Sequence, residues 1–235
     1  MKRNNLWLIP LAFFLICCVL NLVGCAVSVQ LERCMKPALM PLLCATGFIW
    51  LLGRESSFDR TAATLLLCGQ LFGFAGDTAL MGNGFPFFAS GIVLFLIGHI
   101  FYIFLFGRKS LKGRKPWHWA SGIAASLGAS TGLALLIGVK GAMLVPMGIY
   151  SLALMMLIFS TMTGVFRFGG LTWWLLMCGA FLFTMSDVLL AARIFGATGP
   201  LMNSVVIMLT YLLAQGLLAI GGLRLVAQKP SDCQV

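Results

Sequence analysis

The sequence predicts an all-α membrane protein, a polytopic helical bundle of eight transmembrane helices. Three observations lead to this fold class: 60% of the 235 residues are hydrophobic, only 9% are charged, and the mean hydropathy is +1.02. A soluble domain of this length carries far more charge. Since a chain in lipid must satisfy its own backbone polar groups, a series of bilayer-length apolar runs predicts a helical bundle.

Eight apolar runs have roughly the length that a bilayer demands. In chain order they are 6–26, 38–53, 61–81, 86–106, 117–138, 142–164, 171–192 and 202–226. The second run is short, so we expect it to start within the membrane interface. We treat residues 1–235 as a single transmembrane domain.

Segments rich in Gly, Pro and charge separate these runs and define where each helix is expected to end. RESSFDR (54–60) follows the second run and GNGFP (82–86) follows the third. GRKSLKGRKP (107–116) closes the fourth run, and RFGG (167–170) divides the sixth from the seventh. Such segments interrupt helices and carry charge that lipid does not accept.

The first run has a second interpretation. MKRNN, an apolar stretch and then Leu22-Val23-Gly24-Cys25 resemble a bacterial lipoprotein signal with its cleavage site. The apolar run continues beyond the cysteine, and its removal would break the even number of helices. We therefore favour a retained helix, and the signal remains the alternative.

Lysine and arginine are unevenly divided between the two sets of loops. One set holds Lys2, Arg3, Arg54, Arg60, Arg108, Lys109, Lys112, Arg114, Lys115, Arg167, Arg224 and Lys229. The other holds Arg33, Lys36, Lys140 and Arg193. Basic loops stay in the cytoplasm, so we expect an integral protein of a bacterial inner membrane with both termini cytoplasmic.

Charge and cysteine content exclude two other kinds of protein. The net charge of +10 lies in short loops between apolar runs, so it indicates membrane topology and not a nucleic-acid partner. The eight cysteines are scattered without a Cys-x-x-Cys pair and mostly lie in apolar runs. They predict neither a disulfide framework nor a zinc motif.

Two segments of the chain align without gaps. GQLFGFAGDTAL (69–80) matches GAFLFTMSDVLL (179–190), which pairs Gly69 with Gly179 and Asp77 with Asp187. The alignment predicts four helices duplicated to eight, with approximate halves 6–106 and 117–226. Four helices per half make the repeats parallel, although chance similarity between two helices of similar composition is the alternative.

Asp77 and Asp187 are the strongest candidates for chemistry. The chain has six acidic residues, and we expect the other four (Glu32, Glu55, Asp59, Asp232) in loops or the tail. A charged group at the bilayer centre costs at least roughly 2.5–3.5 kcal/mol, so such residues usually face a protein interior and have a function there. One carboxylic acid beside one carboxylate suits general acid/base catalysis. The alternative is a structural polar clamp.

Other polar residues share helical faces with these aspartates or lie on neighbouring helices. The candidate substrate-binding residues are Lys36, His99, Tyr102, Asn203, Tyr211 and Gln215. Each has a simpler role open to it: interhelical hydrogen bonding for most of them, and snorkelling or phosphate binding for Lys36. His99 lies about 20 Å along its own helix, so its contact with Asp77 is not assured.

Five short motifs resemble the lysoplasmalogenases, or YhhN-like integral membrane proteins. They are KPALMPLL (36–43), GDTALM (76–81), GHIFY (98–102), SDVLLA (186–191) and YLLAQ (211–215), in the family's order. The resemblance implies eight helices and hydrolysis of the vinyl ether of lysoplasmalogens to a fatty aldehyde and a glycerophospho-base. It implies a lysophospholipid substrate within membrane lipid and no redox cofactor; we also expect no metal site and no nucleic acid, while protein partners are not predicted.

Two other functions remain open. Intramembrane acids and parallel repeats also fit a small-solute or lipid transporter or channel, and a non-catalytic lipid-binding or assembly protein is possible. A transporter should have helices broken by Gly or Pro near its site. We expect Pro41 and Pro146 near helix starts, which disfavours transport.

Overall fold

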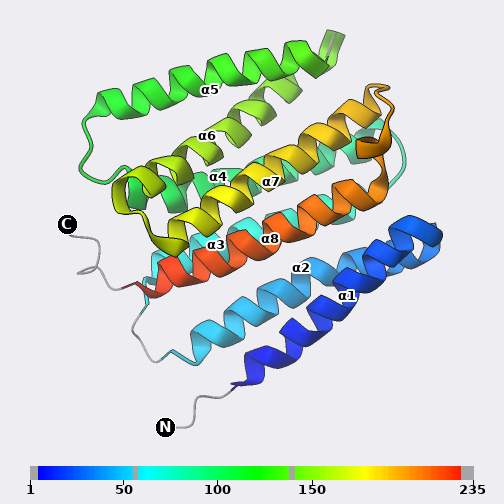
Figure 1. The fold of residues 1–235 in the computed structure, drawn as a ribbon, viewed down its shortest axis with the longest axis horizontal. Coiled ribbons are helices and arrows are strands. Elements are labelled where there is room, and N and C mark those ends of the chain that lie inside the picture. The colour runs from blue at the N-terminus through cyan, green and yellow to red at the C-terminus, as the bar shows by residue number, and fades with distance from the viewer. Residues whose placement is uncertain (1–4, 55–57, 138–140, 229–235) are drawn as a thin grey trace. The chain divides into compact units, whose positions relative to one another are not determined.

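The computed structural model describes residues 5–54, 58–137 and 141–228 (Figure 1). Within these residues the chain forms eight α-helices and three short 3₁₀ turns, without strands. The helices are α1 (Leu8–Val27), α2 (Val29–Leu52), α3 (Arg60–Ala79), α4 (Phe85–Ser110), α5 (Pro116–Ile137), α6 (Leu144–Phe168), α7 (Gly170–Ile194) and α8 (Ser204–Ala227). The prediction of an all-α fold is confirmed. Lys2, Arg3, Glu55, Lys140, Lys229, Asp232 and Cys233 lie outside the described residues.

Seven of the eight helices are long and apolar enough to cross a bilayer, which makes this an integral membrane protein. The helix that falls outside this group is α5, so the predicted eighth span is not confirmed. Ser126 and Ser130 are buried, and most of the rest of α5 is exposed.

The second helix is longer than predicted. It begins at Val29, one residue after α1 ends, because Ser28 caps it: the Ser28 hydroxyl accepts from the Leu31 N–H at 3.3 Å. Glu32 therefore lies in the first turn of α2 and not in a loop. The positive end of the helix dipole stabilises a carboxylate in this first turn. The hydropathy pattern predicted a later start because several of the first residues of the helix are polar.

The prediction that Pro41 lies near a helix start is wrong. Pro37 and Pro41 both lie inside α2, and the helix continues past them to Leu52. Pro146 is the third residue of α6, as expected. Neighbouring helices can compensate for a proline within a membrane helix, so a continuous helix is compatible with both prolines. One argument against a transporter is correspondingly weaker.

The chain divides into two compact units. Unit 1 comprises residues 1–101 and 219–235, and unit 2 comprises residues 102–218. In unit 1, α1 packs along α2 and α2 along α3; in unit 2, α5 packs on α6 and α6 on α7 (Figure 1). These units differ from the predicted halves, because the end of α8 groups with α1–α3. The duplication and the single domain stay predictions.

Glycines bring neighbouring helices into close contact inside each unit. A Cβ at Gly98 of α4 would lie 3.1 Å from the Gly69 carbonyl oxygen and 3.5 Å from the Gly73 nitrogen of α3. A Cβ at Gly179 of α7 would lie 3.2 Å from the carbonyl oxygen of Ala214 on α8. Small residues allow such backbone approach in membrane proteins. The prediction that the Gly69–Gly73 stripe faces protein is confirmed.

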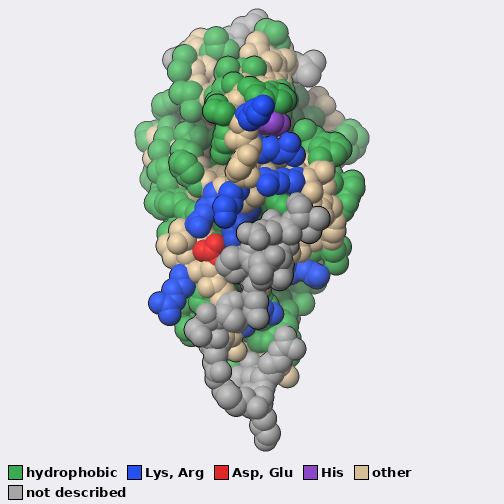
Figure 2. All heavy atoms as spheres, turned by 90° about the vertical axis from the view of Figure 1, so that its left-hand side faces the viewer, with side chains coloured by type: hydrophobic (Ala, Val, Ile, Leu, Met, Phe, Trp, Pro, Cys, Tyr) green, Lys and Arg blue, Asp and Glu red, His purple; other side chains and the backbone are tan. Residues whose placement is uncertain are grey.

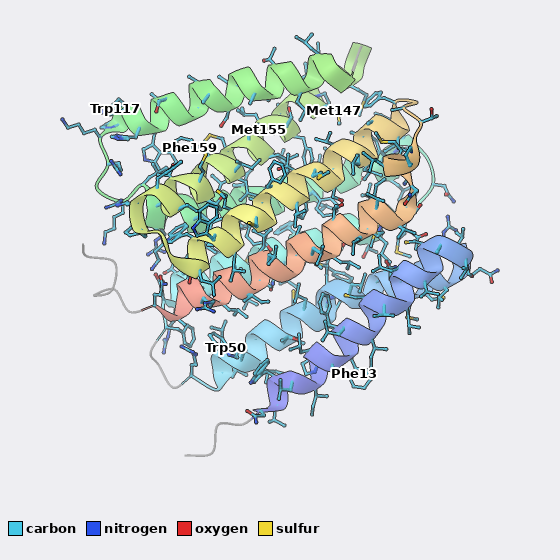
Figure 3. All side chains as sticks on the ribbon, in the orientation of Figure 1. Phe13, Trp50, Trp117, Met147, Met155 and Phe159 are labelled. Atoms are coloured by element: carbon cyan, nitrogen blue, oxygen red, sulfur yellow. The ribbon has the colours of Figure 1, made fainter. Side chains whose placement is uncertain are left out.

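Aromatic and basic residues mark the helix ends. Trp50 lies near the end of α2 with the Arg54 guanidinium 4.1 Å from its ring centroid, and Trp117 stands at the start of α5, stacked on His118 (Figure 3). Basic side chains gather on the face shown in Figure 2. In unit 2, the Arg167 side chain joins α6 to the loop after α4 by donating to the carbonyls of Ser110 and Lys112. Aromatic rings beside basic groups are typical of the membrane interface.

Candidate functional site

Asp77 lies near the end of α3 and is only 3% exposed. Its Oδ1 is 4.0 Å from the ammonium nitrogen of Lys36, whose side chain is 18% exposed. Lys36 lies in the second turn of α2. Because α2 and α3 form an antiparallel hairpin, the start of one helix meets the end of the other. The predicted site residues Lys36 and Asp77 are thus brought together as an ion pair.

Asp187 occupies the corresponding position near the end of α7 and is half-buried. Its Oδ2 accepts a hydrogen bond of 2.5 Å from the hydroxyl of Tyr150, which belongs to the second turn of α6. The preceding residue, Ser186, donates to the Ile207 carbonyl of α8 at 3.0 Å. Two successive residues of α7 therefore bond to two different helices, which holds this part of α7 in place.

Each unit thus contains one aspartate whose polar partner comes from the preceding helix. In unit 1 a cation, Lys36, lies beside Asp77, and in unit 2 a neutral hydroxyl, that of Tyr150, bonds to Asp187. The structure describes each aspartate within its own unit, so a cavity shared by the two stays a prediction.

The glycine contacts between α3 and α4 give the level of the His99 backbone along α3. Gly98, its neighbour on α4, approaches Gly69 and Gly73, whereas Gly76 of α3 meets Phe95. The level of His99 on α3 is therefore four to eight residues before Asp77, or roughly 6–12 Å at 1.5 Å per residue. His99 is buried, with 1% of the residue exposed.

Tyr211 and Gln215 form a short polar ladder on α8. The Gln215 amide donates to the Tyr211 hydroxyl at 3.2 Å, and the Tyr211 ring meets the edge of Phe183 with centroids 5.6 Å apart. Phe183 lies one turn before Asp187 on α7, so Tyr211 is one turn away from the aspartate's level. The Gln215 Oε1 is buried without a hydrogen-bond partner. Tyr211 and Gln215 therefore place polar groups on α8 one and two turns from the level of Asp187.

The contacts described for Asn203 and Tyr102 are to residues close to them in the sequence. The Asn203 side chain accepts from the Val206 N–H at 2.8 Å and donates to the Pro200 carbonyl at 2.6 Å, which makes it the N-terminal cap of α8. Tyr102 is buried and stacks on Phe106 within α4. Neither contact brings these residues to an aspartate, and their substrate-binding role stays a prediction.

Sequence reasoning missed Tyr150 and Gln70. Tyr150 and Asp187 lie 19 and 18 residues from Gly169, the residue between α6 and α7. Counting equal distances from this loop would have paired them, since facing residues of an antiparallel hairpin are equidistant from its turn. The same count pairs Lys36 with Asp77. Gln70 is buried on the Asp77 face of α3, two turns away, and its Oε1 has no hydrogen-bond partner.

The described part of the chain contains no group of three or more His, Cys, Asp or Glu side chains placed to hold a metal ion. Its seven cysteines are all free thiols.

A comparison with known protein families shows to which family the chain belongs. The model of the YhhN family matches residues 31–222, a range that includes both aspartates, Lys36 and Tyr150. The chain belongs to the YhhN family. The resemblance found in the sequence motifs is therefore confirmed.

Two human proteins are similar to the chain over most of its length. Lysoplasmalogenase TMEM86B of Homo sapiens is 28% identical over 226 residues, which cover 93% of this chain and 87% of the relative. Lysoplasmalogenase TMEM86A of Homo sapiens is 27% identical over 189 residues, which cover 79% of this chain and 76% of the relative. No solved structure matches the chain significantly.

Proposed function

We propose that this YhhN protein is a hydrolase that cleaves the vinyl ether bond of lysoplasmalogens, releasing a fatty aldehyde and a glycerophospho-base. The observation that carries the proposal is the similarity to two lysoplasmalogenases over 87% and 76% of their lengths. The geometry supports it, because each unit holds an intramembrane aspartate with a polar partner. Such groups inside apolar helices are expensive and usually functional.

The chemistry of vinyl ethers suits a pair of carboxyl groups. Hydrolysis begins with protonation of the β-carbon, which leaves an oxocarbenium ion that water converts to a hemiacetal. A carboxylic acid supplies the proton, and a carboxylate stabilises the cation or activates the water, as paired carboxylates do at glycosidic bonds. We assign these roles to Asp77 and Asp187.

The remaining polar residues are proposed to bind the headgroup and glycerol of the lysophospholipid. Lys36 is a candidate for the phosphate, because its partly exposed ammonium lies beside Asp77. Tyr211 and Gln215 are candidates for the glycerol oxygens because they lie one and two turns from Asp187 along the α7–α8 contact. His99, Tyr102 and Asn203 remain proposed binding residues on the basis of the sequence.

We further propose that both termini face the cytoplasm of a bacterial cell, on the basis of the division of Lys and Arg between the loops. Three of these basic residues, Lys112, Arg114 and Lys115, lie in one described loop, between α4 and α5. Fusions of a reporter active only in the cytoplasm, placed after residue 235 and between α5 and α6, test this. Activity of the first fusion alone is expected, and the reverse pattern would refute the orientation.

The decisive assay is aldehyde release by purified protein from lysoplasmalogen in detergent micelles. In D₂O the aldehyde should carry one deuterium at its α-carbon when freshly formed, because that proton comes from solvent through a carboxyl group. Unlabelled aldehyde incubated with the protein gives the background from enolisation. The matched lysophospholipid with an acyl ester should not be cleaved. No aldehyde from a well-folded protein would refute the proposal.

Transport is the second candidate, and one observation favours it. Pro37 and Pro41 interrupt the backbone bonding of α2 directly beside Lys36, where a transporter places a helix break. Proteoliposomes loaded with lysoplasmalogen distinguish the two functions. Movement of intact lipid between leaflets without aldehyde supports transport, and aldehyde without lipid movement supports hydrolysis.

A further inference from the structure

The two aspartates have partners with different hydrogen-bonding chemistry. Lys36 offers an ammonium, which only donates, whereas the hydroxyl of Tyr150 either donates or accepts. The Lys36 ammonium, 4.0 Å from Asp77, acts through its charge, and a positive charge stabilises a carboxylate but not a neutral carboxylic acid. A tyrosine hydroxyl matches both forms of a carboxyl group, because it donates to the carboxylate and accepts from the carboxylic acid.

We propose that Asp187 is the general acid of this enzyme, that Tyr150 is its positioning residue, and that Asp77 remains a carboxylate throughout turnover. This inference rests on the proposed vinyl ether hydrolysis. A general acid loses and regains a proton in every cycle, so its partner must suit both states. Tyr150 meets that requirement, and Lys36 does not.

The surroundings of Asp187 are built to hold it still. Tyr150 is 7% exposed and reaches Asp187 from α6, while Ser186 fixes the same turn of α7 to the Ile207 carbonyl of α8. Arg193, six residues further along α7, donates to the Ser204 hydroxyl at 3.0 Å. A phenylalanine at position 150 would fill the same space without a polar atom to satisfy. The hydroxyl is therefore explained by its bond to Asp187.

The proton-transfer step balances with these residues and one water. Asp187 gives its proton to the β-carbon; the π electrons of the C=C bond form the new C–H bond, and an ether oxygen lone pair forms the C=O bond of the oxocarbenium ion. Tyr150 then donates to the new carboxylate, which is the arrangement that the structure shows. Water adds to the cation and returns one proton to Asp187. The hemiacetal hydroxyl proton leaves with the alcohol as the C–O bond breaks.

The pH dependence of the remaining turnover in the aspartate variants distinguishes the roles of the two aspartates. For Asp187→Asn we expect turnover that rises about tenfold for each unit of falling pH, because hydronium ion replaces the missing acid. Asp77→Asn should keep the shape of the wild-type profile at a lower rate. Asp187→Glu, which retains an acid, should also keep the wild-type shape and serves if Asp187→Asn fails to fold. Hydronium dependence in Asp77→Asn with a wild-type shape in Asp187→Asn would overturn the assignment.

Tyr150→Phe tests the positioning role. We expect kcat to fall about 10- to 100-fold with KM changed less than twofold, since misplacement of a reacting group lowers the chemical step. The change should have no further effect in Asp187→Asn and its full effect in Asp77→Asn. Ser160→Ala, which removes a buried hydroxyl bonded within α6 to the Leu157 carbonyl, is the matched control and should keep wild-type kcat.

Two results would overturn the assignment of the general acid and its positioning residue. Both differ from the result that would refute the proposed function. Equal losses from Tyr150→Phe in both aspartate backgrounds, or a rise in KM alone, would show that the hydroxyl acts on structure or binding. Wild-type protein without any aldehyde release would refute the hydrolase itself, and the assignment with it.

Discussion

Lys36 and Asp77 form an ion pair between α2 and α3, with 4.0 Å between the ammonium nitrogen and Oδ1. Both residues lie in helices that are apolar enough to span a bilayer. Removing two charges from water costs several kcal/mol per ion, and their attraction offsets this only in good geometry. Because well-packed apolar residues often stabilise such positions better, the pair is more readily explained by function than by stability.

Loss of the Lys36 cation should be costly to the fold. Lys36→Met leaves Asp77 buried without this partner, so we expect a loss of up to about 3–5 kcal/mol in the free energy of unfolding. Thermal unfolding in detergent measures it. Lys36→Arg keeps the charge and is the control, and Lys36→Met/Asp77→Asn should be more stable than Lys36→Met. Wild-type unfolding of the single variant would show that the pair is not formed in the native protein.

Removal of either carboxyl group should abolish most turnover while the fold remains. Asp187→Asn removes the proposed proton donor, and Asp77→Asn removes the carboxylate proposed to stabilise the cation; loss of a proton-transfer group typically lowers rates by about 10²–10⁴-fold, and we expect a loss of similar size for Asp77→Asn. Aldehyde release from lysoplasmalogen measures the effect, with gel filtration and thermal unfolding as checks on folding. Near-normal release by either well-folded variant would remove that aspartate from catalysis.

Gly24 is expected to tolerate no side chain. A Cβ there would lie 2.5 Å from the backbone nitrogen of Glu32 and 2.9 Å from its Cα, so α1 and α2 must separate. We expect Gly24→Ala to destabilise by about 1–3 kcal/mol, the usual penalty of overpacking. Gly128→Ala is the matched control, since a Cβ at Gly128 of α5 meets nothing within 4 Å. Equal unfolding temperatures for the two variants would contradict the close contact.

The substrate site is expected to be apolar along most of its length, with the polar groups at one end. Phe95 packs on Gly76 beside Asp77, and Phe183 precedes Asp187 by one turn. Each buried methylene contributes about 0.8 kcal/mol, so a water-soluble vinyl ether lacking four methylenes should lose on the order of 100-fold in kcat/KM. Kinetics below the critical micelle concentration measure this. Equal kcat/KM for both substrates would argue against a chain-binding tunnel.

Turnover is expected to need no added metal. The proposed mechanism uses proton transfer alone, and both aspartates with His99 would together give zinc only three protein ligands, the smallest number that it prefers. Treatment with a chelator followed by elemental analysis and assay should leave activity unchanged. Stoichiometric metal whose removal abolishes activity, and whose return restores it, would instead make the aspartates metal ligands.

Much of the fold could be read from the sequence because hydropathy and helix length are local properties. The α-helical class and the approximate spans follow from the apolar runs, and the proposal of Asp77 and Asp187 as site residues follows from the charges within them. The Gly69–Gly73 stripe was recognised because helical spacing fixes which residues share a face. Hydropathy predicted too late a start for α2, because several of the first residues of this helix are polar. The Ser28 cap and the helix dipole stabilise the helix in this segment.

Only the tertiary structure decided which side chains meet. Lys36 reaches Asp77 and Tyr150 reaches Asp187 because each pair is equidistant from the turn of an antiparallel hairpin. The glycine contacts fix the register of α3 against α4, with Gly98 at the level of Gly69 and Gly73. Composition and periodicity determine that a helix forms and which face it buries. The register between two helices depends on side-chain packing across their contact, and that information appears only when both helices are in place.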